Sequence, residues 1–266
     1  MSTLDLRRAS SLDEALRILR DEPRMPIAGA TDVYVALNFG QPMPTRYLDI
    51  GALDELRAIE VRSDTLVLGA MASFTSLIHS PLVAARLPML IEAASLVGGV
   101  QIQNRGTLGG NIANGSPAGD SLPVLVAVDA VLVLRSASGT RRVAITEFYT
   151  GYRKSVLRPD ELITAIEVAP VAGRQYFRKV GTRAALAISK IVIAGVRDAT
   201  PRIAFGSVAP TVIRARATER ALAAGATIEE ASDILTREIA PIDDLRSSAS
   251  YRMRVATNLL RHFWSA

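Results

Sequence analysis

The sequence predicts a protein of the α+β class, divided into two domains near residue 173. Short apolar segments with the length of strands alternate with segments of helical periodicity along residues 1–173. With 266 residues, 49% of them hydrophobic, the chain is long enough for one large core or two ordinary ones. The charge also shifts: residues 1–175 hold 17 Lys and Arg against 18 Asp and Glu, whereas residues 176–266 hold 14 against 8. We therefore expect domains at 1–173 and 174–266.

The N-terminal segment predicts a helix, a strand, a tight loop and a second helix. Ser11 and Glu14 have the spacing of a capping box, and helical spacing continues up to Pro23. Residues 25–28 predict a strand that leads into the loop 29–32. Four apolar residues form the buried stripe expected for the first helix: Leu12, Ala15, Leu16 and Leu19.

The middle of the chain predicts strands, helices and one long irregular segment. Strands are expected at 48–50, 66–69 and 162–168, a helix opens at Ser73, and a single buried helix covers 82–96. Residues 101–123 are rich in Gly, Asn, Ser and Thr and show little periodicity, so we expect a functional loop there.

Three further segments complete the fold. Residues 131–134 and 142–145 predict a hairpin, as do residues 187–196 and 202–208. Residues 211–266 predict helices. The last of these carries a stripe that we interpret as core: Val255, Leu259, Leu260 and Phe263.

Composition excludes several functions. Without cysteine, the chain has no disulfide, no thiolate metal site and no iron–sulfur cluster held by its own thiolates. His79 and His262 belong to no spaced set of metal ligands. The net charge of +5 comes without a basic, aromatic-interleaved run, so nucleic-acid binding is not expected.

The sequence also predicts a soluble protein. No apolar run reaches the roughly 18–20 residues needed to cross a bilayer. Residues 1–10 lack the apolar segment of a secretory signal, so we expect no membrane association and a cytoplasmic location.

Two glycine-containing loops carry the chemistry. They comprise residues 28–32 and 107–111, and the second continues through residues 113–120. Glycine lets backbone N–H groups converge on an anion, so the two loops together predict a grip on the two phosphates of a dinucleotide. Hydroxyl donors are available at Thr31, Thr107 and Ser116, whereas a carboxylate is better suited to accept from a sugar hydroxyl than to meet phosphate. Neither a Rossmann fingerprint nor a Walker A loop is present.

These loops resemble one protein family. Residues 26–32 read PIAGATD, and residues 104–123 read NRGTLGGNIANGSPAGDSLP. Both segments are similar to the FAD-binding medium subunit of the xanthine dehydrogenase and carbon monoxide dehydrogenase family of molybdenum hydroxylases. Further similarity extends over nearly the whole chain, in residues 152–154, 157–163, 179, 181–183, 187–190, 243–246, 251 and 252.

The resemblance implies a fold and a set of cofactor-binding residues. The fold is an FAD-binding domain of the p-cresol methylhydroxylase and vanillyl alcohol oxidase type, with two subdomains, followed by a small sheet-plus-helices domain like the C-terminal domain of the carbon monoxide dehydrogenase flavoprotein. Asp120 would bind a sugar hydroxyl, Val97 and Ile163 would contact apolar parts of FAD, and Lys179 would lie near the flavin. The residues expected at the pyrophosphate are Ala28, Gly29, Ala30, Thr31, Asp32, Val33, Thr107, Leu108, Gly109, Gly110 and Asn111.

The resemblance also implies partners. An iron–sulfur small subunit would hold 2Fe-2S clusters, a molybdopterin large subunit would hold a molybdenum–pterin centre, and the complex would be a dimer of heterotrimers. This chain would bind FAD non-covalently and pass electrons from the clusters to a terminal acceptor, without a catalytic residue or a metal of its own. The identity of the hydroxylated substrate and of the acceptor, whether NAD, oxygen or a quinone, stays open.

Two alternatives stay open, and a departure from the family pattern supports only the second of them. The first loop usually contains two consecutive glycines, and here the second is Ala30. A free-standing FAD-dependent oxidase of the same fold is one alternative. A subunit that has lost FAD and serves only assembly is the other.

Overall fold

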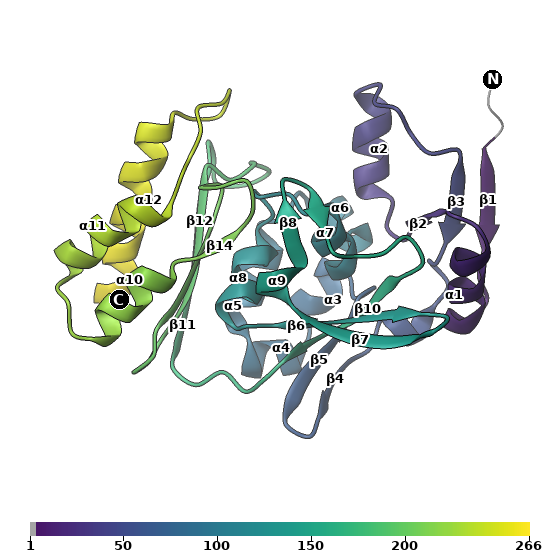
Figure 1. Ribbon diagram of the computed structural model, residues 1–266, viewed down its shortest axis with the longest axis horizontal. Helices are drawn as coiled ribbons and strands as arrows, with labels where there is room; N and C mark the ends of the chain where they lie inside the picture. Colours follow the sequence, from purple (N-terminus) through teal and green to yellow (C-terminus); the bar gives the residue numbers. More distant parts are fainter. Residues whose placement is uncertain (1–3) are drawn as a thin grey trace.

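The computed structural model describes residues 4–266, and the first three residues of the N-terminal segment lie outside it (Figure 1). Among the described residues, no helix has the length and apolar character that crossing a membrane requires.

The chain begins with a small parallel sheet in the order β1-β3-β2, at one end of the molecule in Figure 1. Its strands and helices follow one another as β1 (Asp5–Arg8), α1 (Leu12–Asp21), β2 (Met25–Ile27), α2 (Thr31–Asn38) and β3 (Arg46–Asp49). The predicted order of helix, strand, loop and helix is therefore confirmed.

Helix α1 forms where the sequence predicts it, but its N-terminus is only half a capping box. The Ser11 hydroxyl accepts from the N–H of Glu14 at 3.2 Å. The Glu14 carboxylate accepts from the N–H of Ser10 at 2.7 Å instead of that of Ser11. The predicted apolar stripe is buried as expected: Leu12, Ala15, Leu16 and Leu19.

A five-stranded antiparallel sheet in the order β4-β5-β10-β6-β7 forms the centre of the first two-thirds of the chain. The 3-10 helix η1 (Asp54–Leu56) precedes this sheet. The strands of the sheet are β4 (Ile59–Arg62), β5 (Thr65–Gly69), β6 (Val131–Ser136), β7 (Gly139–Ala144) and β10 (Leu162–Val168). The predicted hairpin and the strand 162–168 are confirmed.

Between β5 and β6 the chain is helical. The helices are α3 (Phe74–Ile78), α4 (Pro81–Arg86), α5 (Pro88–Ser95), α6 (Val100–Arg105), α7 (Leu108–Asn114) and α8 (Ser121–Ala127). After β7 come α9 (Ile145–Phe148) and the small hairpin of β8 (Tyr149–Gly151) and β9 (Lys154–Ser155).

Two predictions in this region were wrong. The single helix at 82–96 is divided at Leu87, whose φ of −142° leaves the helical region. Pro88 explains the break, because its ring disfavours helical geometry in the preceding residue and it cannot donate to a helical hydrogen bond. The predicted loop at 101–123 is mostly α6, α7 and the start of α8, short helices that glycines separate and that a search for periodicity misses.

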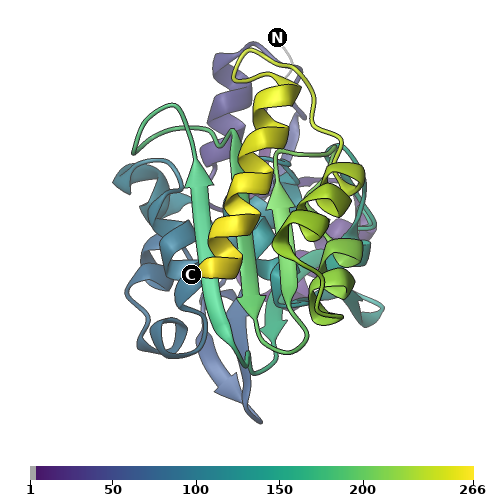
Figure 2. The ribbon, with the colours of Figure 1, turned by 90° about the vertical axis from the view of Figure 1, so that its left-hand side faces the viewer.

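The last third of the chain forms a four-stranded antiparallel sheet in the order β11-β12-β13-β14, followed by three helices. The strands are β11 (Arg174–Val180), β12 (Ile191–Arg197), β13 (Arg202–Gly206) and β14 (Ile213–Arg214). The helices are α10 (Arg216–Ala223), α11 (Ile228–Glu238) and α12 (Ala249–Ser265). Figure 2 shows α12 lying across the outer face of this sheet.

This sheet is buried on both faces. Successive side chains of β12 point to opposite faces and therefore pack into two different cores. Val192 and Ala194 pack into the large core that includes α5 and α8. Ile191 and Ile193 pack into a second core with α10, α11 and α12. The predicted stripe on the last helix, Leu259, Leu260 and Phe263 with Val255 at its margin, belongs to this second core. Side chains along a strand point alternately to its two faces, so β12 contributes to both cores.

Candidate functional site

The first loop presents unused hydrogen-bond donors. Residues 28–30 connect β2 to α2, and the N–H of Tyr34 donates to the Ala30 carbonyl at 3.1 Å as the first helical bond. Within the described chain, the N–H groups of residues 29–33 have no acceptor, and no side chain caps the helix. Free donors and the positive end of a helix dipole favour an anion at this point.

Ala30 occupies the left-handed region, with φ 61° and ψ 4°. This conformation destabilises a residue with a Cβ by about 1–2 kcal/mol, whereas it destabilises glycine hardly at all. The second glycine of the family pattern therefore has a conformational reason. Ala30 adopts the same kind of turn at a cost, so the departure from the pattern does not remove the loop.

The two loops lie against each other. An ideal Cβ on Gly29 would lie 1.7 Å from the carbonyl oxygen of Arg105, at the end of α6. Next to this contact, the N–H of Phe74 donates to the Gly106 carbonyl at 3.2 Å, and Thr107 forms a β-bridge to Ser73. The contact between Gly29 and residues 105–106 was not predicted from the sequence. The only sequence feature that could have indicated it is Gly106, immediately before the TLGG segment.

The second loop differs from what the sequence predicts. Residues 108–110 form the first turn of α7, and their N–H groups are already engaged: Leu108 donates to Ala72 O at 3.0 Å and Gly109 to Ala70 O at 2.7 Å. The Gly110 N–H donates to the Thr107 hydroxyl at 3.1 Å. The N–H groups of residues 108–111 are therefore engaged, unlike those of residues 29–33.

Glycines 109 and 110 have different roles. A Cβ on Gly109 would lie 2.7 Å from the Ala70 carbonyl oxygen, so this glycine is required for packing. Gly110 is exposed, and its Cβ would meet only the Thr107 hydroxyl, at 2.8 Å. Because Gly110 has no side chain, the exposed side of the loop at this position is free of side-chain atoms.

Asp120 and Lys179 meet in a buried ion pair. Lys179 Nζ lies 2.6 Å from Asp120 Oδ2, and the two side chains are 7% and 9% exposed, respectively. Lys179 also donates to the Leu96 carbonyl at 3.0 Å, which places the pair beside Val97. The other carboxylate oxygen, Asp120 Oδ1, is buried and has no partner. Burial raises the pKa of Asp120 to about 6, against the opposing effect of Lys179.

The remaining predicted residues lie around these two centres. The Asn111 side-chain oxygen accepts from Ser121 at 2.7 Å, and the Ser116 hydroxyl accepts from the N–H of Ala118 at 3.3 Å. Ile163 is buried in β10, whose next residue, Thr164, accepts from the N–H of Ala70 beneath Gly109. No hydrogen bond connects Ile163 to the Asp120 pair.

The two histidines make hydrogen bonds away from the two loops. His79 Nδ1 bonds the Thr75 carbonyl, and His262 Nδ1 bonds the Tyr176 hydroxyl. Across residues 4–266, no group of three His, Cys, Asp or Glu side chains has an arrangement that would hold a metal.

Comparison with known proteins identifies the family. Residues 2–171 match the FAD binding domain in molybdopterin dehydrogenase, and residues 178–266 match the CO dehydrogenase flavoprotein C-terminal domain. The chain belongs to this family. Its members are FAD-dependent oxidoreductase subunits, and the resemblance in the loops is thereby confirmed.

Individual relatives align along most of their length. A putative xanthine dehydrogenase FAD-binding subunit of Escherichia coli (strain K12) is 34% identical, with 96% of this chain and 92% of the relative covered. The carbon monoxide dehydrogenase medium chain of Hydrogenophaga pseudoflava is 33% identical, with coverage of 90% and 88%. A solved structure of carbon monoxide dehydrogenase from that organism superposes with a TM-score of 0.90, 33% identity and coverage of 98% and 95%.

The residues present fit FAD. The first loop offers free donors for a phosphate, and the Asp120 Oδ1 atom has a vacant acceptor position for a hydroxyl. Gly110 leaves its side of the second loop open, in keeping with the close approach of a ligand.

Gly29→Ala tests the contact between the loops. The added Cβ overlaps the Arg105 carbonyl, and because that atom belongs to the backbone, one loop has to move. We expect at least a tenfold loss of FAD affinity, equivalent to about 1.4 kcal/mol, measured by flavin fluorescence titration. Gly151→Ala is the matched control, since a Cβ there meets nothing within 4 Å. Equal FAD affinity in both variants would contradict the contact's role.

Ala30→Gly tests the strain in the first loop. Release from the left-handed penalty of about 1–2 kcal/mol outweighs glycine's entropic cost of about 0.5–1 kcal/mol, so stability should rise by about 0.5–1 kcal/mol. Urea unfolding of the FAD-free protein measures the change. Ser63→Gly, at φ 45° in the distant β4–β5 turn, controls for a general effect at positive φ. A destabilised Ala30→Gly variant would show that Ala30 is held there without strain.

Proposed function

We propose that this chain is the FAD-binding electron-transfer subunit of a molybdenum hydroxylase complex. In this function, electrons from 2Fe-2S clusters on an iron–sulfur small subunit pass through FAD to a terminal acceptor. A molybdopterin large subunit carries out the substrate chemistry, and the assembly is a dimer of heterotrimers. FAD, when bound, supplies the redox chemistry, and the chain holds and orients it.

The full-length similarity to FAD-binding subunits and medium chains supports this function most strongly. The printed names of these relatives describe components of larger dehydrogenases, xanthine dehydrogenase and carbon monoxide dehydrogenase among them. This chain has no cysteine with which to ligate an iron–sulfur cluster, so the clusters would belong to another chain.

Each part of the site has a separate task in this proposal. The amides of residues 29–33 bind the pyrophosphate, and residues 107–111 pack along it. Asp120 Oδ1 accepts from a sugar hydroxyl, and Val97 and Ile163 provide apolar contacts. Lys179 lies beside the flavin and holds Asp120 in place through their ion pair. Without a cysteine, and with both histidines engaged away from the loops, the attachment of FAD is non-covalent.

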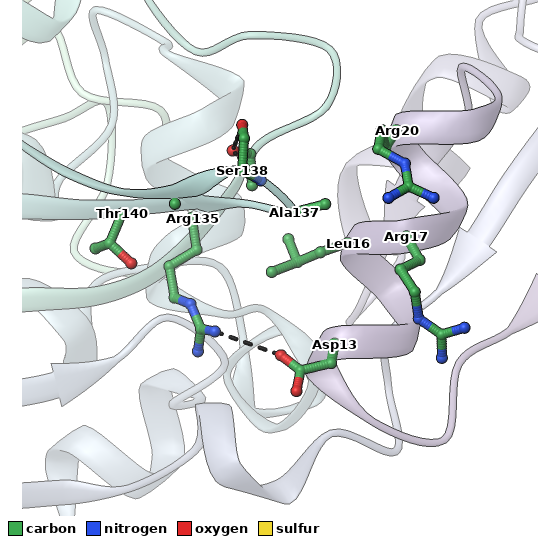
Figure 3. A pocket seen from close by; sticks show the side chains of 10 residues that line it. Asp13, Leu16, Arg17, Arg20, Arg135, Ala137, Ser138 and Thr140 are labelled. Atoms are coloured by element: carbon green, nitrogen blue, oxygen red, sulfur yellow. Dashed lines mark hydrogen bonds and ion pairs between the residues drawn. The ribbon is translucent and has the colours of Figure 1, made fainter.

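A free-standing oxidase of the same fold is less well supported. Such an enzyme needs acid and base residues at a substrate pocket of its own. A cavity of about 430 Å³ lies between α1 and the β6–β7 turn (Figure 3). Its lining includes Arg17, Arg20 and Arg135, and Asp13 already pairs with Arg135 there at 3.4 Å. This surface offers no general base next to the FAD loops.

Purification of the native complex tests the proposed function. We expect one FAD per chain, released completely by acid precipitation, together with a molybdenum-containing and an iron-containing partner chain. The chain alone, loaded with FAD, should not reduce a dye when given xanthine, aldehyde or carbon monoxide. Turnover of any of these by the isolated chain would favour the oxidase, and flavin that stays with the precipitate would contradict non-covalent binding.

The pH dependence of FAD affinity tests the role of Asp120. An ionised carboxylate accepts a hydrogen bond more strongly than a protonated one. Because the pKa of Asp120 is raised to about 6, affinity should be constant at higher pH and fall as the pH drops through about 6. Fluorescence titration between pH 5 and 8 measures it. Asp120→Asn should bind more weakly and show no step, and a step that persists in this variant would assign the titration to another group.

A further inference from the structure

Arg252, in a segment that resembles the family, belongs to neither of the two loops nor to the buried ion pair. Arg252 lies in α12 and is only 3% exposed. Its Nη1 donates to the carbonyls of Lys190 and Ser207, each at 3.0 Å. Its Nη2 lies 2.7 Å from Asp244 Oδ1, in the segment that precedes the helix. One guanidinium therefore joins the start of β12, the end of β13 and the 243–247 turn.

The two strand ends held by Arg252 contact the loop before Asp120. The Ser207 N–H donates to the Pro117 carbonyl at 2.8 Å, and the Ser189 hydroxyl donates to the Ala118 carbonyl at 3.0 Å. The two serine hydroxyls lie 3.2 Å apart in a buried position. Thus two consecutive carbonyls of the 116–120 loop are fixed by donors from the last third of the chain.

The backbone geometry at Gly206 and Ser207 constrains their contact with the Pro117 carbonyl. Ser207 has φ 64°, a conformation that costs a serine about 1–2 kcal/mol. The preceding Gly206 approaches so closely that a Cβ would lie 3.0 Å from the Pro117 carbonyl oxygen. The left-handed turn directs the Ser207 N–H at that carbonyl, and Arg252 bonds the carbonyl of the same residue.

Lys179 belongs to the same sheet. It pairs with Val192 in the β11–β12 register, and Val192 pairs with Gly206 in the β12–β13 register. The sheet therefore carries the cation of the buried pair on one strand and the donors to the Asp120 loop at the ends of the next two. Both partners of the pair depend on how these strands are held together at this end.

We infer that Arg252 is a positioning residue for the FAD site, acting through Ser207 and Ser189 on the loop that carries Asp120. This inference rests on the proposed function, because it assumes that Asp120 Oδ1 accepts from a hydroxyl of FAD. Burying an arginine carries a desolvation penalty, so its charge has to be compensated by several well-placed acceptors. Its fork of donors can hold three separate segments at fixed angles, which an apolar side chain cannot do.

Arg252→Gln should weaken FAD binding roughly tenfold in the full-length chain, through displacement of Asp120. The decisive measurement is the double variant: in an Asp120→Asn background, Arg252→Gln should cause no further loss of FAD affinity. As a single substitution, Arg252→Gln should also shift or flatten the pH step near 6 that we expect for the native chain. Arg252→Lys should recover part of the affinity, because one of the carbonyl contacts can be kept.

Arg214→Gln is the matched control. The Arg214 side chain, in the last third of the chain, is also only 9% exposed, but it pairs with Glu219 and with Asp129, beyond the opposite end of α8. We expect its loss to lower the unfolding midpoint and to leave FAD affinity unchanged. If Arg252→Gln does not fold, Ser189→Ala removes the donor to Ala118 together with the hydroxyl contact to Ser207, leaves the bond from the Ser207 N–H to Pro117 in place, and should weaken FAD binding about threefold.

The outcomes separate this inference from the function on which it rests. Additive losses of FAD affinity in the double variant, or unchanged affinity in both Arg252→Gln and Ser189→Ala, overturn the positioning role while the FAD site stands. Full affinity in Asp120→Asn overturns the assignment of Asp120 itself and the inference with it.

Discussion

The two-sided burial of the sheet formed by β11–β14 is the constraint on which the site depends. One face packs on α5 and α8 and the other on α10, α11 and α12, so strand β12 is buried along almost its whole length. A sheet covered on both faces cannot shift its register without moving its side chains out of both cores. Lys179 and the serines at the strand ends therefore reach the Asp120 loop in a fixed position, although that loop belongs to the other half of the chain.

Glycines of the site are explained by packing as often as by the ligand. Gly29 accommodates the Arg105 carbonyl, and Gly109 accommodates Ala70, so both would be required in a protein that bound nothing. Gly110 differs, because its open side faces solvent. Ala30 shows the reverse case, in which a conformation suited to glycine is adopted by another residue. A glycine-rich motif thus combines folding and binding requirements, and only the contacts distinguish them.

The sequence predicted those elements whose own periodicity determines them. Helix α1, the β6–β7 hairpin and strand β10 have clear apolar patterns. Charged strands such as β1 and β11 were missed, because their conformation depends on hydrogen bonds to neighbouring strands. In the site, the glycine content of the two loops predicted that they act together, and the family resemblance supported this prediction. The occupied amides of α7 could not be predicted, because their acceptors lie in the distant turn at residues 70–72.

The charges of the site are divided in a way that favours a polyanionic cofactor. Two unit charges roughly 10 Å apart interact by about 1.7 kcal/mol at an effective dielectric constant of about 20. A bare carboxylate near the proposed pyrophosphate site would therefore oppose binding by an amount of this order for each phosphate charge. Lys179 compensates the charge of Asp120 through Oδ2 and leaves Oδ1 without a partner. The pair thus retains a strong acceptor for a hydroxyl, while the amides at the N-terminus of α2 supply the positive potential. In the proposed site, the ion pair would make a carboxylate acceptor compatible with phosphate binding.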